Sequence, residues 1–159
     1  MYDYKIAAAD KATLYRDLAA ALEALVAGEP DGVANMANAA ALIFDTLPGV
    51  NWAGFYRNLG GELVLGPFQG RAACIRIPFG QGVCGAAAAT RQVQRVDDVH
   101  AFLGHIACDA ASNSELVVPI VRDGVLLAVL DIDSPEIARF DAEDEAGGVR
   151  LGEIMARAI

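Results

Sequence analysis

The chain has 159 residues, of which 55% are hydrophobic and 21% are charged. This size suits one domain with one core, and the composition excludes global disorder. The formal net charge of −9 opposes binding to a nucleic acid backbone. No apolar run reaches the roughly 20 residues of a membrane span, and the first residues lack a signal-peptide pattern. We therefore expect one cytoplasmic domain over residues 1–159, with neither nucleic acid nor a membrane as partner.

Two helices are predicted at the beginning of the chain. Leucines three and four residues apart form an apolar stripe on a helix from Asp10 to about Ala27. A second, Ala-rich helix is predicted from Asp31 to Thr46, before the helix-breaking pair Pro48-Gly49.

The middle of the chain changes to short aliphatic and aromatic runs that are typical of strands. Four strand candidates share this pattern: residues 50–58, 62–68, 73–79 and 93–96. The first two are expected to form a hairpin through Leu59-Gly60-Gly61. The Ala-rich residues 80–92 predict a short helix before the last of them.

The last third of the chain contains a polar segment, a hairpin and a helix. Residues 97–113 follow neither the helix nor the strand period, and polar loops of this length often carry function. Residues 114–121 and 125–133 flank the hairpin signal Asp123-Gly124, and a final helix begins at about Asp141. The order of elements predicts an α+β fold, an antiparallel sheet with helices packed on it.

Cysteine is present three times, an odd number that argues against a structural disulfide framework. Cys84 lies at an expected helix start, which favours a thiolate, but on the residues alone we prefer the simpler role of a small residue that allows close helix–sheet packing between glycines. Cys108 lies in the polar loop between His105, which would lower its pKa, and Asp109, which would raise it. Cys74 is expected to be a buried, inert thiol on a strand.

His100, His105 and Cys108 lie close together in the sequence of the polar loop, and these residue types can bind a metal ion. Their spacing has no second close Cys or His pair to complete a tetrahedral site. We expect no bound metal.

Three carboxylates should meet at one end of the sheet. Asp131 and Asp133 alternate with an isoleucine and share one strand face, and antiparallel pairing brings Glu115 near them. Such a cluster is costly unless it binds a cation, shares a proton or stays solvated as an exposed acidic rim. Trp52 and Tyr56 share a face of an earlier strand, where core packing is the simplest role. An aromatic wall beside acids would also suit a small zwitterion with an apolar tail.

Four stretches together resemble the free methionine-(R)-sulfoxide reductases, single-domain enzymes with the GAF fold. They are NWAGFY, LGPFQGRAACIRIPFGQGVCGAAAATRQ, VDDVHAFLGHIACDAASNSELVVPI and LDIDSP. The resemblance covers the chain from about Val50 to its end and implies a GAF-like antiparallel sheet with helices packed on it.

The resemblance also implies a site and a mechanism. Cys108 would attack the sulfoxide sulfur, release methionine and become a sulfenic acid, which Cys74 would resolve with Cys84 assisting or acting as a relay. Trp52 and Tyr56 would hold the methyl end of the substrate. The acids Glu115, Asp131 and Asp133 would bind its ammonium group and protonate the sulfoxide oxygen.

The partners implied by the resemblance are free methionine sulfoxide and an external dithiol reductant such as thioredoxin, with no bound cofactor. A homodimer is compatible with this fold family. The main alternative is a non-catalytic GAF-type module that senses a small molecule, and a second is a thiol redox switch. Consumption of methionine sulfoxide by the protein would distinguish an enzyme from the sensor module and from the redox switch.

Overall fold

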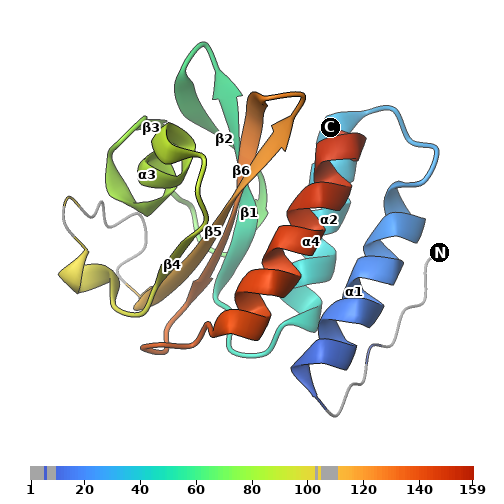
Figure 1. Cartoon of the computed structure of the whole chain (residues 1–159), viewed down its shortest axis with the longest axis horizontal. Coiled ribbons are helices and arrows are strands. Elements are labelled where there is room, and N and C mark those ends of the chain that lie inside the picture. The colour runs from blue at the N-terminus through green and yellow to red at the C-terminus, as the bar shows by residue number, and fades with distance from the viewer. Residues whose placement is uncertain (1–5, 7–9, 103, 105–110) are drawn as a thin grey trace.

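A six-stranded sheet forms the centre of the computed structural model, with neighbouring strands antiparallel in the order β3-β2-β1-β6-β5-β4 (Figure 1). The strands are β1 (Trp52–Leu59), β2 (Glu62–Gln69), β3 (Arg76–Pro78), β4 (Gln94–Val96), β5 (Ser114–Arg122) and β6 (Val125–Ser134). The structure describes residues 6, 10–102, 104 and 111–159. Both predicted hairpins are present, and β1 pairs with β6 to join them in the middle of the sheet.

The helices divide unequally between the two faces of the sheet. The helices α1 (Lys11–Val26), α2 (Gly32–Thr46) and α4 (Ala142–Ala158) lie on one side, and the short α3 (Gly82–Thr90) lies on the other (Figure 1). This arrangement confirms the predicted α+β class.

Aspartate caps the N-terminus of each long helix. The side chain of Asp10 accepts a hydrogen bond from the backbone of Thr13 at 2.8 Å, and Asp31 and Asp141 cap the other two helices in the same way. These side chains satisfy backbone donors that have no partner within the helix. The predicted helix starts are therefore confirmed.

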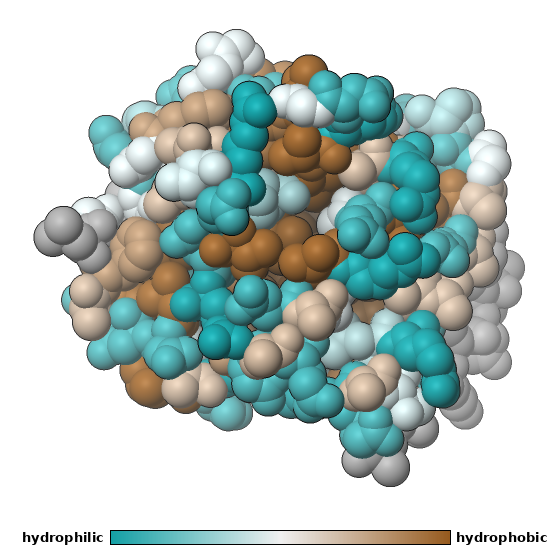
Figure 2. All heavy atoms as spheres, in the orientation of Figure 1, coloured by the Kyte–Doolittle hydropathy of each residue, from teal (hydrophilic) through white to brown (hydrophobic). Residues whose placement is uncertain are grey.

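A core of mostly aliphatic residues fills the space between the sheet and the three long helices, with Leu18, Ile43, Leu130 and Leu151 fully buried in it. Gly147 lets α1 and α4 approach, because a Cβ atom there would collide with the ring of Tyr15. The surface seen in Figure 2 is mixed, with hydrophobic residues gathered in a central hollow that hydrophilic residues surround.

A smaller core lies between α3 and the opposite face of the sheet. It contains Trp52, Tyr56 and Val117 from the sheet and Cys84 from α3. Trp52, Tyr56, Cys74 and Cys84 therefore gather on this face, away from the three long helices.

Two local predictions differ from the structure. The strand expected over residues 73–79 is confined to β3, because it pairs with β2 only at residues 62–64. Cys74 therefore lies ahead of the strand, only partly buried, rather than on it. The polar segment also contains a short 3₁₀ helix, η1 (Val99–Ala101), whose first turn is capped by Asp98.

No helix within the described ranges combines the length and apolar character needed to cross a bilayer.

Candidate active site

The strand register brings the predicted carboxylates together on the α3 side of the sheet. Glu115 of β5 is paired with Asp133 of β6, and Asp133 is also paired with Trp52 of β1. Residues directly opposite each other in a sheet project to the same face, and Asp131 shares that face two residues earlier. One carboxylate oxygen from each acid lies within 4.8 Å of the others. The predicted proximity of the three acids, which we call the acid cluster, is therefore confirmed.

Burial and mutual repulsion favour protonated carboxyls in the acid cluster. Asp131 and Asp133 are 6% and 8% exposed. Burial, together with the nearby Asp133, raises the pKa of Glu115 to about 9. Burial and Glu115 also raise the pKa of Asp131, although hydrogen bonds with Cys84 and Asp133 act in the opposite direction. The cluster can therefore hold a proton near neutral pH.

A pair of polar residues outside the predicted set contacts the acid cluster. The hydroxyl of Ser112 is 3.2 Å from Asp133 Oδ2, and the amide Nδ2 of Asn51 donates to Ser112 Oγ at 3.3 Å. The backbone N–H of Asn51 also donates to the carbonyl of Asp133 at 3.0 Å. Sequence reasoning missed both residues, since a single serine and a single asparagine in polar surroundings have no distinguishing pattern.

The aromatic residues form a stacked wall beside these acids. The ring centroids of Trp52 and Tyr56 are 5.9 Å apart, and those of Trp52 and Phe68 are 5.2 Å apart. The indole N–H of Trp52 donates to the carbonyl of Arg71 at 3.0 Å, which fixes the ring. Gly54 leaves room for this arrangement, since a Cβ atom there would lie 2.7 Å from the indole. Phe68 was not predicted as a member of the wall.

Tyr56 also borders the acid cluster through its hydroxyl end. Burial and the neighbouring Asp131 raise its pKa far above the ordinary tyrosine value, so the phenol stays neutral. Its ring is almost fully buried. Tyr56 therefore offers an apolar surface and a neutral polar group to the same site.

Cys84 is a buried free thiol in the first turn of α3. Burial raises its pKa well above the usual range, and Asp131 and Glu115 act in the same direction. The thiolate that the helix dipole alone would favour is therefore not expected here, and the buried position of Cys84 agrees with the preferred packing role. A dipole worth about 1 kcal/mol does not offset the desolvation of a charge beside two carboxyl groups.

Of the other two cysteines, Cys74 lies within the described residues and Cys108 does not. Cys74 is disulfide-bonded, so the expectation of a buried, inert thiol from its sequence position is wrong. Cys108, predicted as the nucleophile, lies outside the described residues, as do His105 and Asp109. On either side of that segment, Gly104 accepts a backbone hydrogen bond from Gly82 at the start of α3, and Ser112 contacts Asp133.

The remaining polar-loop candidate, His100, is exposed and its Nε2 lies 2.9 Å from Asn113 Oδ1. Among the described residues, the acid cluster is the group that offers several anionic oxygens to one cation, either a metal ion or an ammonium group.

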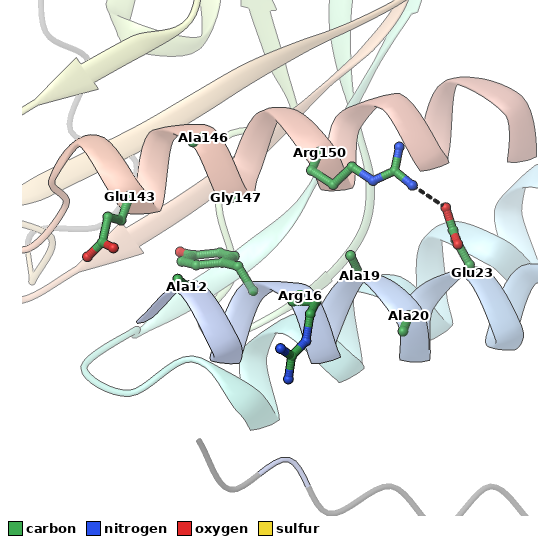
Figure 3. Close-up of a pocket in the computed structure, with 10 residues that line it drawn as sticks. Ala12, Arg16, Ala19, Ala20, Glu23, Glu143, Ala146, Gly147 and Arg150 are labelled. Atoms are coloured by element: carbon green, nitrogen blue, oxygen red, sulfur yellow. Dashed lines mark hydrogen bonds and ion pairs between the residues drawn. The ribbon is translucent and has the colours of Figure 1, made fainter. Parts of the chain in front are cut away.

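A separate cavity of about 530 Å³ lies between α1 and α4, and none of the predicted site residues lines it (Figure 3). At one end of it Arg150 and Glu23 form an ion pair of 2.6 Å between the helices. Its lining contains no cysteine, histidine or serine.

Comparison with known proteins gives a consistent result. Residues 29–159 match the family described as GAF domain. The chain is 55% identical over 138 residues to the free methionine-R-sulfoxide reductase of Escherichia coli, covering 87% of this chain and 84% of that protein.

Solved structures agree with this comparison. The free methionine-R-sulfoxide reductase of Neisseria meningitidis, solved in complex with its substrate, has a TM-score of 0.95 and 46% identity, over 99% of this chain and 95% of that one. A putative GAF sensor protein from Burkholderia vietnamiensis has a TM-score of 0.92 and 57% identity, over 94% and 96%. Fold, extent and identity together mean that this chain belongs to the free methionine-R-sulfoxide reductase family of oxidoreductases, within the GAF domain family.

Proposed function

We propose that the chain reduces free L-methionine-(R)-sulfoxide to L-methionine. The observation that carries this proposal is the acid cluster, with carboxylate oxygens within 4.8 Å, beside the stacked wall of Trp52 and Tyr56. A compact cation with an apolar tail complements such a site. The preference for the R epimer rests on the named activity of the relatives from Escherichia coli and Neisseria meningitidis.

In this proposal the two halves of the site bind the two ends of the substrate. The acid cluster binds the ammonium group, and Trp52 and Tyr56 hold the methyl end. A methionine within a peptide has no ammonium group at that position, and its flanking backbone would have to enter a largely buried site. The cluster therefore explains selectivity for the free amino acid.

A protonated carboxyl is needed for the chemical step. A thiolate cannot displace oxygen from a sulfoxide unless that oxygen accepts a proton or a strong hydrogen bond in the transition state. The raised pKa of Glu115, about 9, supports a carboxyl that still carries its proton at neutral pH. The cluster thus supplies both negative charge for binding and a proton for catalysis.

The proposed thiol chemistry has three steps: reduction of the sulfoxide, formation of a disulfide and reduction of that disulfide. Cys108 attacks the sulfoxide sulfur, the oxygen passes to the cysteine, and the products are methionine and a sulfenic acid on Cys108. The thiol of Cys74 then attacks the sulfenic acid, which forms a disulfide and releases water. An external dithiol reduces this disulfide to two thiols and is itself oxidised to a disulfide.

The different states of the other two cysteines support this division of roles. Cys74 is disulfide-bonded, whereas Cys84 is a buried free thiol with a raised pKa. We therefore assign resolution to Cys74 and an assisting or relay role to Cys84.

Recycling needs a dithiol donor, and thioredoxin is the proposed one, with no cofactor bound to the chain itself. A reaction that ends in a disulfide and depends on such a donor requires a compartment that keeps thiols reduced. We therefore propose a cytoplasmic location, with residues 1–159 acting as one catalytic domain.

The test is turnover of the two sulfur epimers of free L-methionine sulfoxide with a dithiol reductant. Wild type should consume only the R epimer, and Cys108→Ser should consume neither. Full activity in Cys108→Ser would assign the nucleophile to Cys84 instead. No consumption of either epimer by wild type would reject the reductase activity and favour a non-catalytic sensor.

We also propose a homodimer that forms through the cavity between α1 and α4. Its floor is built from small residues, and Ala12, Ala20 and Ala146 are exposed there. Figure 3 shows α1 and α4 side by side, with Glu143 near the start of α1 and Arg150 near Glu23. The lining carries two acidic and two basic side chains, Glu23, Glu143, Arg16 and Arg150, so two copies facing each other across this cavity would meet without a net charge of one sign.

Ala20→Arg tests the homodimer without disturbing the buried core, since Ala20 is exposed on α1. Wild type should sediment as a dimer and the variant as a monomer. A wild-type monomer at micromolar concentration would reject this interface.

A further inference from the structure

The side chain of Ser112 occupies a position that the proposed reaction has not yet explained. It is 3% exposed and lies four residues after Cys108 in the sequence. Its hydroxyl lies between two groups, with Asn51 Nδ2 at 3.3 Å and Asp133 Oδ2 at 3.2 Å.

The direction of these hydrogen bonds follows from the atoms involved. The amide nitrogen of Asn51 can only donate, so Ser112 Oγ accepts from it. The hydroxyl has one hydrogen, and this arrangement leaves that hydrogen for Asp133 Oδ2. A hydrogen bond donated to a carboxyl oxygen favours the ionised form of that carboxyl.

The members of the acid cluster therefore do not have equivalent surroundings. Asp133 receives the Ser112 hydroxyl, whereas Asp131 has hydrogen bonds with the Cys84 thiol, a weaker donor, and with Asp133 itself. Burial and Asp133 dominate the surroundings of Glu115, and both raise its pKa. The neutral phenol of Tyr56 is the further titratable group that borders the cluster from β1.

We infer that Ser112, held by Asn51, is a positioning residue that assigns the negative charge of the acid cluster to Asp133, so that substrate ammonium binds there and Glu115 carries the proton. This inference rests on the proposed function and adds a division of labour to it. Asn51 is well placed for the role because it immediately precedes Trp52, and its backbone N–H also holds the carbonyl of Asp133. The same short segment thereby connects the aromatic wall to the anion.

The main test is a set of kinetic measurements on Ser112→Ala, Ser112→Thr and Asn51→Ala with free methionine-R-sulfoxide. Ser112→Ala should raise KM about 10-fold with less than a threefold change in kcat, because a hydrogen bond to a charged group is lost. Ser112→Thr restores the hydroxyl and should recover most of KM. Asn51→Ala should raise KM about threefold, because Ser112 loses the group that orients it. This variant tests the inference independently if the extra methyl group of Ser112→Thr does not fit. A fall in kcat at unchanged KM, or no change in either constant, would overturn the inference.

Ser114→Ala is the matched control. Ser114 is also fully buried at the start of β5, but its hydroxyl donates to the carbonyl of Glu136 at 2.7 Å rather than to the acid cluster. Its loss should lower the melting temperature and leave KM unchanged. An equal rise of KM in Ser114→Ala would mean that general loosening explains the Ser112 result.

A thermal double-mutant cycle separates this inference from the proposed function. The melting-temperature shifts of Ser112→Ala and Asp133→Asn should fail to add in the double variant, because each removes the same hydrogen bond. Ser114→Ala and Asp133→Asn should add. Additive shifts for Ser112→Ala and Asp133→Asn would overturn the Ser112 contact, even if the wild type is an active reductase. Non-additive shifts for the same two variants, together with an inactive wild type, would reject only the reductase activity.

Discussion

Each face of the sheet buries acidic side chains, but the charged groups around them have opposite signs on the two faces. On the side of the long helices, the side chain of Asp144 is 1% exposed and contacts Lys11 at 2.5 Å and Arg139 at 3.0 Å. The hydroxyl of Tyr15 also donates to it at 2.9 Å. On the α3 side, Glu115 and Asp131 have no lysine or arginine within 4.0 Å among the residues that the structure describes.

The difference shows how burial of the same chemical group serves two purposes. Asp144 has fixed cations and joins α1 to the start of α4, so its charge contributes to folding. In the acid cluster the neighbouring charged groups are other acids, and the pKa values of Glu115 and Asp131 rise instead. Clustered carboxyls with raised pKa values are typical of functional sites rather than of structural ion pairs.

The largest effect is expected from Asp144→Ala. This change leaves Arg139, whose side chain is 8% exposed, without its carboxylate partner. Loss of one member of a buried pair costs about 3–5 kcal/mol of unfolding free energy. Urea unfolding of wild type and variant measures the loss.

Glu62→Ala is the control for Asp144→Ala. Glu62 pairs with Arg76 at 2.7 Å on the exposed surface of β2 and β3, and such pairs contribute less than about 1 kcal/mol. A loss below 1 kcal/mol in Asp144→Ala as well would contradict the structural role of the buried acid.

The opposite behaviour is expected for Glu115→Ala and Asp133→Ala. Each should lower kcat/KM for free methionine-R-sulfoxide about 100-fold, the size expected when a general acid or a charged binding group is removed. Neither should show the large loss of stability expected for Asp144→Ala, since both relieve repulsion between buried acids. Steady-state kinetics and urea unfolding of the same preparations check both statements, and unchanged kinetics in both variants would reject the role of the acid cluster.

The sequence predicts part of this acid cluster because the regular geometry of strands controls it. Asp131 and Asp133 alternate around Ile132 and therefore share a strand face. The Asp123-Gly124 turn joins the two strands, but its own register would pair Glu115 with Ile132, and a register shift between Ile120 and Val121 brings Glu115 opposite Asp133. The aspartates that cap the N-termini of the helices can also be predicted from the sequence, since capping is a local interaction.

Long-range contacts are the part that sequence patterns do not predict. Phe68 joins the aromatic wall through the pairing of β2 with β1, and Ser112 meets Asn51 across 61 residues of chain. The pKa of the Cys84 thiol is likewise controlled by long-range contacts. Its local helix position favours a thiolate, but the decisive carboxyls come from β5 and β6.

The raised pKa of Glu115 predicts how stability depends on pH. Folded Glu115 holds its proton up to about pH 9, whereas the unfolded side chain loses it near its ordinary value of 4.5. Between these values the folded state binds more protons, so the free energy of unfolding falls as pH rises, by at most about 1.4 kcal/mol per pH unit for one proton. Urea unfolding at pH 5, 7 and 9 measures this slope.

Glu115→Gln removes one titrating group and should make the slope between pH 5 and pH 9 less steep, leaving the contribution of Asp131, whose pKa is raised to about 8. Asp141 does not confuse the result, because hydrogen bonds from Lys11 and the start of α4 lower its pKa and place its contribution below this range. A slope of unchanged steepness in the variant would mean that Glu115 is not the group that takes up the proton.

The smallest effect is expected on the aromatic side of the site. Trp52→Phe keeps an aromatic ring but loses the indole hydrogen bond to Arg71 and part of the stacked surface with Tyr56 and Phe68. We expect KM for methionine-R-sulfoxide to rise about 10-fold, because one buried hydrogen bond and part of an aromatic contact are together worth about 1–2 kcal/mol. Phe44→Leu on α2 is the control, since Phe44 is 36% exposed and is not part of the wall. If Trp52→Phe leaves KM unchanged while Glu115→Ala abolishes turnover, the acids alone bind the substrate and the aromatic face serves only the core.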